Sequence, residues 1–387
     1  MIKTLTAYTN EIDDVEKALG EIFDQLDLGK NLLKNSIGII SCFADFLNSG
    51  VVKALVGKLP FDLVGATTLG GSTGGNLGET ILILTVLTGD EVEFVTGITD
   101  PILEEDEGLF RRAYEKAAGS RKDKPALMLS FAPLLRNVSC DYMVNTFTAI
   151  SGNVPNFGTQ AVDHNSDYHA SQTILNGDAF PERYVFVLVY GPLNPSFIIG
   201  GISEERVFPE KGLITASQGN QLQTVNGLSV IDYLVSLGLS KDENGSIVGI
   251  NSFPFVLDYK DGAQPVIRVM FAITPDGYAV CGGNMPVGAI LGVGTISAEE
   301  VIATTERALK GALQGGKKNG MLIFSCIGRF FAQGFNPTAE MEKVQEVINN
   351  GVPFHLGYSG GEICPVYGKD GSIINRNHND TIVICVF

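Results

Sequence analysis

One order of elements occurs three times along this chain of 387 residues. In each copy a helical pattern precedes an apolar strand, a second helical pattern follows, and a glycine-containing segment leads into another apolar strand. The first strands begin at Ser36, Ala126 and Met321, which lie 23, 21 and 23 residues after the start of the preceding helix. Because matched spacing of this kind marks a repeated structural unit, the sequence predicts three related αβαββ units.

Two further features favour repetition over the ordinary alternation of strands and helices in an α/β chain. A Ser-Cys pair ends the first strand at 41–42 and at 325–326, and a Val-Pro pair opens the glycine segment at 154 and at 352. The glycines expected to be equivalent are Gly65, Gly158 and Gly357. The predicted helices and strands of the three copies are 13–26, 36–43, 46–58 and 80–87; 105–118, 126–132, 141–150 and 184–190; and 298–313, 321–326, 338–349 and 381–387.

The region between copies two and three, residues 191–296, has a different pattern. Pro275-Asp276-Gly277 separates two apolar runs and predicts a β-hairpin, and Asn226-Gly227 marks a turn ahead of a short helix, 228–237. We therefore expect an α/β fold of mixed β-sheets, built from repeated αβαββ units in two lobes, with a β-rich insertion. The predicted boundary near residue 225 gives an N-terminal domain, 1–225, and a C-terminal domain, 226–387.

The charge and composition of the chain exclude several classes of protein. Its net charge is −16, from 27 Lys and Arg against 43 Asp and Glu, whereas a surface that binds nucleic acid needs clustered positive charge. No apolar run approaches the roughly 20 residues of a membrane-spanning helix, and residues 1–14 do not resemble a signal peptide. The six cysteines form no Cys-x-x-Cys motif. We expect a soluble cytoplasmic protein with reduced thiols and no membrane insertion.

The segment from Gly70 to Gly74 matches the G-x-S-x-G motif of serine hydrolases, with Ser72 as its nucleophile. That motif acts at a turn from a strand into a helix, whereas here a further strand follows. The same pattern recurs at 357–361, which favours a repeated backbone geometry over a nucleophile. The exposed amides around Ser72 and Thr73 could instead bind a small anion such as a carboxylate. A close approach of two strands and a helix explains the glycines equally well.

Histidines and acidic residues give no metal-binding pattern. His164 and His169, which could be imagined with Asp163 as a metal set, are five residues apart, which fits neither one face of a helix nor a strand, so we expect these histidines to lie in a surface loop. No motif for a metal or an organic cofactor is present, and none is predicted.

The densest set of polar residues lies in the third copy. Arg329 follows the first strand, Ser359 and Glu362 follow the next, and residues 377–381, which include His378 and Asn379, precede the last. If these strands are neighbours, the guanidinium could bind a carboxylate and Glu362 an ammonium group, a combination that suits an amino acid. The alternative is an internal ion pair between Arg329 and Glu362 that only fixes the strands.

These residues resemble the FIST family, a prokaryotic sensory module with an N-terminal and a C-terminal half. The resemblance is carried by residues 57–60 and 64–75, by 214–220 with 225–227, and most strongly by 324–329, 353–365 and 378–381. It implies a protein that binds a small ligand such as an amino acid and signals through a protein partner in trans. It also places Arg329, Glu362, His378 and Asn379 on recurring positions of the family.

Our expectation is therefore a sensory protein that is not an enzyme. The candidate ligand-binding residues are Arg329, Ser359, Glu362, His378, Asn379, Ser72 and Thr73. The alternative function is a serine hydrolase that uses Ser72.

Overall fold

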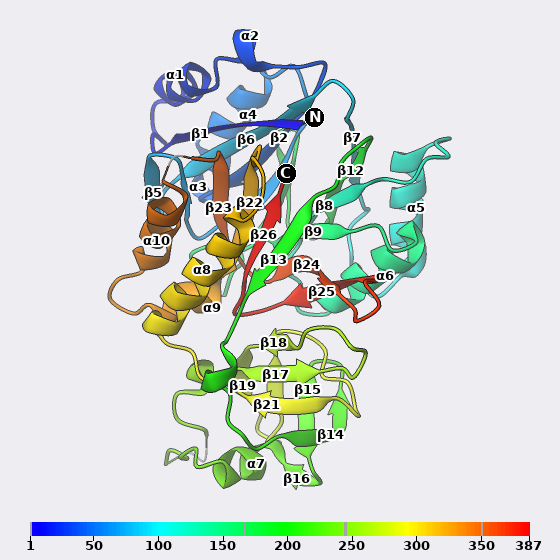
Figure 1. The fold of residues 1–387 in the computed structure, drawn as a ribbon, viewed down its shortest axis with the longest axis vertical. Helices are drawn as coiled ribbons and strands as arrows, with labels where there is room; N and C mark the ends of the chain where they lie inside the picture. Colours follow the sequence, from blue (N-terminus) through cyan, green and yellow to red (C-terminus); the bar gives the residue numbers. More distant parts are fainter. Residues whose placement is uncertain (1, 166, 244–245, 350) are drawn as a thin grey trace.

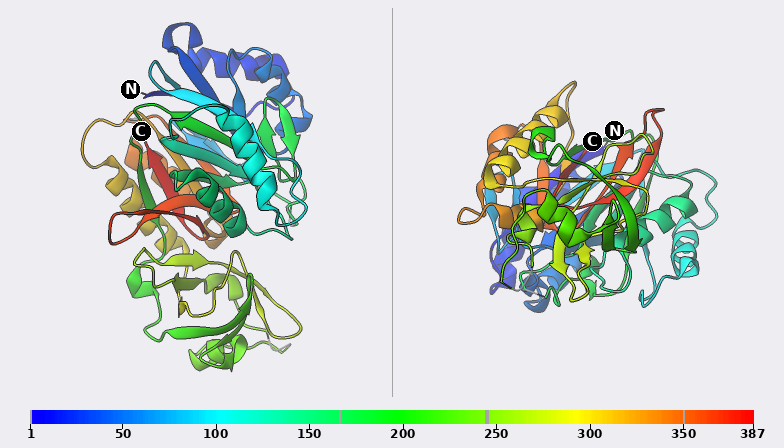
Figure 2. Two further views of the ribbon diagram at one scale, coloured as in Figure 1. Left: turned by 90° about the vertical axis from the view of Figure 1, so that its right-hand side faces the viewer. Right: turned by 90° about the horizontal axis from the view of Figure 1, so that it is seen from below.

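A computed structural model describes residues 2–165, 167–243, 246–349 and 351–387. It consists of a main body made of three α/β units and a smaller lower lobe of β-strands, residues 201–296 (Figure 1). The side view in Figure 2 shows the two lobes one above the other. The expected fold class, with mixed sheets, repeated units, two lobes and a β-rich insertion, is confirmed.

The three units have the same succession of elements. Unit 1 contains β1 (Ile2–Thr9), α1 (Val15–Leu26), α2 (Leu28–Asn31), β2 (Asn35–Cys42), α3 (Asp45–Asn48), α4 (Val51–Val56), β3 (Leu63–Thr67), β4 (Gly71–Thr73), β5 (Asn76–Gly78) and β6 (Leu82–Gly89). Unit 2 contains β7 (Glu93–Ile98), α5 (Glu107–Ala118), β8 (Leu127–Ala132), α6 (Cys140–Ser151), β9 (Asn156–Gln160), β10 (Thr173–Leu175), β11 (Asp178–Phe180) and β12 (Val185–Tyr190). Unit 3 contains β13 (Ser196–Gly200), α8 (Ala298–Leu313), β22 (Met321–Cys326), α9 (Ile327–Ala332), α10 (Ala339–Ile348), β23 (Phe354–Ser359), β24 (Glu362–Tyr367), β25 (Ile373–His378) and β26 (Ile382–Val386).

The lower lobe is inserted into unit 3 between β13 and α8. It contains η1 (Glu204–Arg206), β14 (Gly212–Gln218), β15 (Gln221–Val225), β16 (Leu228–Ser229), α7 (Val230–Ser236), η2 (Ile250–Ser252), β17 (Phe255–Asp258), β18 (Val266–Arg268), β19 (Met270–Ile273), β20 (Ala279–Cys281) and β21 (Ile290–Val293). The predicted hairpin is β19–β20. The insertion begins after Gly200, and not at residue 191 as expected, because β13 pairs with β26 of unit 3.

The three sheets of the main body have the same strand order. In unit 1 the order is β1-β6-β2-β3, in unit 2 it is β7-β12-β8-β9, and in unit 3 it is β13-β26-β22-β23. The last two strands in each of these orders, β2–β3, β8–β9 and β22–β23, are parallel. The other neighbouring pairs are antiparallel. The expected repetition is confirmed, although the sequence pattern did not indicate the leading strands β1, β7 and β13.

Each unit contributes its short hairpin to the sheet of a different unit. The β4–β5 hairpin of unit 1 pairs with β23 of unit 3, β10–β11 of unit 2 pairs with β3 of unit 1, and β24–β25 of unit 3 pairs with β9 of unit 2. The exchange is cyclic, so every sheet is completed by a hairpin from another unit. Consequently no unit contains all the strands of its own sheet.

The glycines at 65, 158 and 357 occupy equivalent places. Each lies two residues before the last residue of the parallel pair, which is Thr67, Gln160 or Ser359. A Cβ on Gly158 would be 1.8 Å from the carbonyl oxygen of Ser130, and one on Gly65 would be 1.9 Å from that of Ile40. Glycine is required at these two positions because any side chain would overlap the neighbouring strand.

The hydrophobic cores of the main body are repeated with the three units. The inner faces of the three sheets share one central core, to which Ile39, Leu129 and Phe324 belong. One outer core lies between each sheet and its helices, and the lower lobe has a core of its own.

The predicted helix 46–58 is split into α3 and α4 because Gly50 has φ of 86°. In the described part of the chain, no helix has both the length and the apolar character needed to span a membrane.

Candidate functional site

Four fully buried residues near the β24–β25 hairpin have polar atoms without a hydrogen-bond partner. Among the described residues, no hydrogen-bond partner is found for Oε1 of Glu362, Oδ1 and Nδ2 of Asn377, Oδ1 of Asn379 and Oδ2 of Asp380. Each of the four residues is at most 1% exposed. A buried polar group without a partner costs about 1–3 kcal/mol, so these groups require a polar partner such as an ordered water or a ligand. We call Glu362, Asn377, Asn379 and Asp380 the polar cluster.

The local fold explains why these side chains meet. Glu362 begins β24 and pairs with His378 of β25 and with Thr159 of β9. Asp380 lies in the short turn from β25 to β26 with φ of 50°, a left-handed conformation that Asp tolerates better than most residues. The hairpin therefore brings residue 362 next to residues 377–380, although they are far apart in the sequence.

Burial dominates the electrostatics of the two carboxyl groups in the cluster. It raises the pKa of Glu362 well above its usual range, and nearby Asp380 raises it further, while the Thr381 hydroxyl and the charge of Arg329 oppose the shift. Burial also raises the pKa of Asp380 to about 7, with Arg329 again opposing. The Thr381 hydroxyl donates to Oε2 of Glu362 at 2.7 Å. A cation placed between these carboxyl groups would favour their charged forms.

Amide groups surround Gly361, next to the carboxyl groups. A Cβ on Gly361 would lie 3.0 Å from Oε1 of Gln160, 3.2 Å from Oδ1 of Asn377 and 3.4 Å from Nδ2 of Asn379. Gly328, at the start of α9, has a similar role, because a Cβ there would be 1.9 Å from Oδ1 of Asp380. These two glycines let the polar side chains approach the backbone closely.

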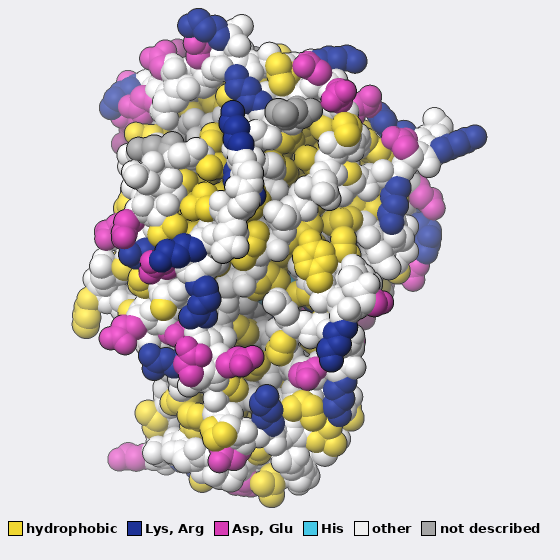
Figure 3. Space-filling model, in the orientation of Figure 1, with side chains coloured by type: hydrophobic (Ala, Val, Ile, Leu, Met, Phe, Trp, Pro, Cys, Tyr) yellow, Lys and Arg dark blue, Asp and Glu magenta, His cyan; other side chains and the backbone are white. Residues whose placement is uncertain are grey.

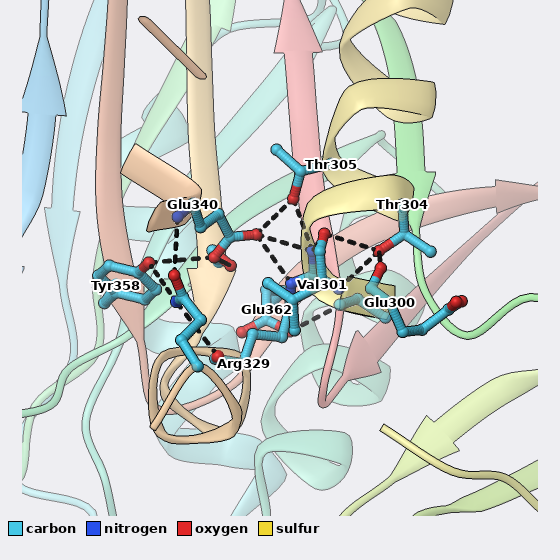
Figure 4. A network of polar contacts seen from close by, with 11 residues as sticks. Glu300, Val301, Thr304, Thr305, Arg329, Glu340, Tyr358 and Glu362 are labelled. Atoms are coloured by element: carbon cyan, nitrogen blue, oxygen red, sulfur yellow. Dashed lines mark hydrogen bonds and ion pairs between the residues drawn. The ribbon is translucent and has the colours of Figure 1, made fainter. Parts of the chain in front are cut away.

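Arg329 is bound to a different carboxylate from the one that the sequence suggested. It lies in α9, is 1% exposed, and donates from Nε and Nη2 to Oε1 of Glu340 in α10, at 3.0 and 2.7 Å. Thr304, Thr305 and the carbonyl of Val301 accept its other hydrogen bonds. Figure 4 shows this network, in which Tyr358 also donates to Glu340. With these bonds made, Arg329 does not bind Glu362 directly, and it acts on the polar cluster only through its charge.

Ser359 and His378 lie beside the cluster and have partners. The Ser359 hydroxyl donates to the carbonyl of Gly361 at 2.5 Å and accepts from Thr159 at 2.8 Å. His378 lies 3.1 Å, through Nε2, from the carbonyl of Cys364. Burial lowers the pKa of His378 to about 3, so the ring is neutral and Nε2 donates this bond. Both residues fix the shape of the site.

Ser72 and Thr73 lie in the β4–β5 hairpin of unit 1, away from the cluster and on the sheet of unit 3. The Ser72 hydroxyl donates to the carbonyl of Asn76 at 3.2 Å and accepts from Gln345 at 3.1 Å, and that of Thr73 donates to the carbonyl of Phe354. Neither a histidine nor a carboxylate among the described residues hydrogen-bonds Ser72. A hairpin thus replaces the strand-to-helix turn of a nucleophile elbow.

His164 and His169 of unit 2 each contact another side chain. His164 stacks on Phe43 with a ring-centroid distance of 4.4 Å, and His169 pairs with Asp167. Asp163 accepts hydrogen bonds from Asn165 and Ser171. Over the described ranges, no group of three or more His, Cys, Asp and Glu side chains could hold a metal ion.

The lower lobe adds residues that the sequence analysis missed. Arg268, at the end of β18, is fully buried, and it donates to the carbonyl of Asn377 and to Oδ1 of Asp141, each at 2.8 Å. Its Nε has no partner among the described residues. A Cβ on Gly282 would lie 2.4 Å from Oδ1 of Asn379, so the lower lobe covers the cluster. An arginine inside the apolar run 266–270 was the signal that could have indicated this position.

A cleft of about 740 Å³ lies between the two lobes and reaches the edge of the cluster. His378 and Thr381 line it from the main body, and Gly201, Val256 and Ile267 are among the lining residues from the lower lobe. We call it the interlobe cleft. On the face in Figure 3, Lys and Arg are interspersed with Asp and Glu and form no continuous basic surface.

Comparisons with known proteins identify two family domains. The FIST N domain matches residues 36–228 and the FIST C domain matches residues 228–365. No curated protein sequence matches the chain. Two solved structures of cyanuric acid hydrolase, one of them from A. caulinodans, are similar at 10% sequence identity, and each comparison covers 100% of this chain and 98% of the other. Their TM-scores are 0.38 and 0.37.

Proposed function

Because the chain belongs to the FIST family of sensory domains, we propose that it binds an amino acid or related amine through the polar cluster. The observation that carries this proposal is the pair of buried carboxyl oxygens without partners, Oε1 of Glu362 and Oδ2 of Asp380. An ammonium group offers three N–H donors and a positive charge. The donors would satisfy the unpaired oxygens, and the charge would favour the ionised carboxylates that burial disfavours.

The other cluster atoms fit the rest of such a ligand. Oδ1 of Asn379 is a further acceptor for the ammonium group, and Nδ2 of Asn377 is an unused donor for a carboxylate. Arg329 was expected to take that carboxylate, but its bonds to Glu340 leave this role to Asn377 and the unpartnered Nε of Arg268. The ligand would then contact both lobes.

The proposed role is binding without turnover, read out by a signalling protein that acts in trans. The surroundings of Ser72 support it, because the described contacts of that hydroxyl provide no general base. Ser72→Ala should therefore leave any weak hydrolysis of a generic ester unchanged. A loss of several orders of magnitude in a folded variant would support the hydrolase alternative.

The binding proposal is tested by a thermal-shift screen of amino acids, amines and carboxylates that lack an amino group. Binding to the folded state stabilises it by about 2.7 kcal/mol at a hundredfold excess over Kd, which raises the Tm by several degrees. Cationic compounds should give this shift, and Glu362→Gln with Asp380→Asn should abolish it, while Ser72→Ala serves as a control outside the cluster. The proposal is wrong if no cationic compound shifts the wild type, or if the double variant binds with unchanged Kd.

A further inference from the structure

The interlobe cleft has an apolar interior and a charged rim. Its apolar lining includes Ile199 of the main body and Ile202, Val256, Ile267 and Ile290 of the lower lobe. The charged lining residues, by contrast, are exposed, and they are Glu204, Lys211 and Asp258. A volume of about 740 Å³ falls within the range of about 300–1,000 Å³ that is usual for small-molecule sites. The cleft therefore offers much more space than an ammonium group occupies.

Thr381 contacts both this cleft and the polar cluster. The Thr381 hydroxyl donates to Oε2 of Glu362 at 2.7 Å. Its methyl carbon would lie 3.6 Å from a Cβ on Gly201, which also lines the cleft. Thr381 thus presents its hydroxyl to Glu362 and its methyl group toward Gly201. A ligand anchored at Glu362 could extend past Thr381 into the cleft.

We propose that the interlobe cleft holds an apolar chain of the ligand whose charged nitrogen is bound at Glu362 and Asp380. The ligand class is then an amine or amino acid with a long aliphatic or aromatic chain, and not a small polar amino acid. This inference rests on the proposed function, since the cluster must first bind the charged nitrogen. The physical reason is the contrast between unpartnered carboxyl oxygens at one end and aliphatic side chains at the other.

The test is a homologous series of straight-chain amino acids, from alanine through norvaline and norleucine to 2-aminooctanoic acid, measured by isothermal titration calorimetry. Burial of one methylene contributes about 0.8 kcal/mol, which corresponds to about fourfold in Kd. We expect the Kd to fall by about two- to fourfold with each added methylene. A Kd that does not change along the series would overturn the inference and leave the ammonium site standing, whereas a wild type that binds no member contradicts both.

Variants that narrow the cleft provide a second, independent readout. Val256→Phe and Ile290→Phe each add volume at a partly buried lining residue of the lower lobe. Val235→Phe is the matched control, because Val235 is 39% exposed on α7 and is not a lining residue. In folded variants the two cleft substitutions should weaken binding of 2-aminooctanoic acid at least tenfold and leave binding of alanine nearly unchanged. Equal effects on both ligands, or none on either, would overturn the inference.

Discussion

Asp380 links the stability of the ligand-free protein to pH. Its folded-state pKa is about 7, against an ordinary value of 3.8, so the folded protein keeps a proton that the unfolded chain has lost. The stabilisation is fully present below pH 3.8 and is lost as the pH rises through 7. We expect the free energy of unfolding to fall by roughly 2–3 kcal/mol from pH 5 to pH 8 through this group alone.

Urea unfolding of the wild type and of Asp380→Asn over this pH range measures that contribution. The variant should lose the part of the slope that Asp380 contributes, because an amide does not titrate, whereas Glu362, whose pKa is also raised, keeps its own contribution. If both proteins have the same slope, the titrating group lies elsewhere. A cationic ligand should release protons on binding near pH 6, which calorimetry in buffers of different ionisation enthalpy would detect.

The partner of Arg329 can be identified by double substitution. Arg329→Met leaves Glu340 buried without its cation, and breaking such a pair costs about 3–5 kcal/mol. We expect Arg329→Met with Glu340→Gln to recover much of this loss in urea unfolding, because the structure pairs these two residues. Arg329→Met with Glu362→Gln is the matched control, and it should recover less. The reverse order would support the Arg329–Glu362 pair that the sequence suggested.

At the level of the strands, the parallel pairs β2–β3 and β8–β9 each depend on a glycine that lies against a backbone carbonyl of the neighbouring strand. Gly158→Ala would place a Cβ 1.8 Å from the carbonyl oxygen of Ser130, so β8 and β9 would have to separate. We expect a loss of several kcal/mol or failure to fold, since overpacking of a core typically costs 1–3 kcal/mol and this contact involves rigid backbone.

Gly20→Ala provides the matched control for that substitution. Gly20 lies inside α1, and a Cβ there would have no atom within 4 Å. Alanine in an exposed helix interior is favoured over glycine by about 1 kcal/mol, so this variant should raise the Tm. If both variants have the same effect on thermal unfolding, the close approach of β8 and β9 does not limit stability.

At the level of the whole molecule, the two lobes should differ in their ability to fold alone. The lower lobe has its own hydrophobic core, so a fragment of residues 204–296 should unfold cooperatively. A fragment of unit 1, residues 1–89, lacks the β10–β11 hairpin that completes its sheet, and its own β4–β5 hairpin lacks the partner β23. We expect this fragment to be unfolded or aggregated by circular dichroism. Cooperative unfolding of residues 1–89 would contradict the importance of hairpin exchange.

Most elements and their repetition could be predicted from the sequence because they depend on local patterns. The period of apolar residues identified α1, α8 and α10 to within a few residues, and continuous apolar runs identified buried strands such as β12. The sequence also suggested that Glu362 and Asn379 lie near each other if their strands are neighbours, and the β24–β25 hairpin brings residue 362 beside residue 378. The leading strands β1, β7 and β13 were missed because their apolar pattern is weaker, with partly exposed residues in each.

Which strands and side chains become partners was decided only by the tertiary structure. The exchange of hairpins among units leaves no local signal, because the same short strands could complete the sheet of any unit. Arg329 pairs with Glu340, and not with Glu362, since α9 and α10 pack so that this carboxylate comes within 2.7 Å. Arg268 reaches the cluster from the other lobe. The sequence determined the residues that need buried partners, and the packing of elements determined which partners they have.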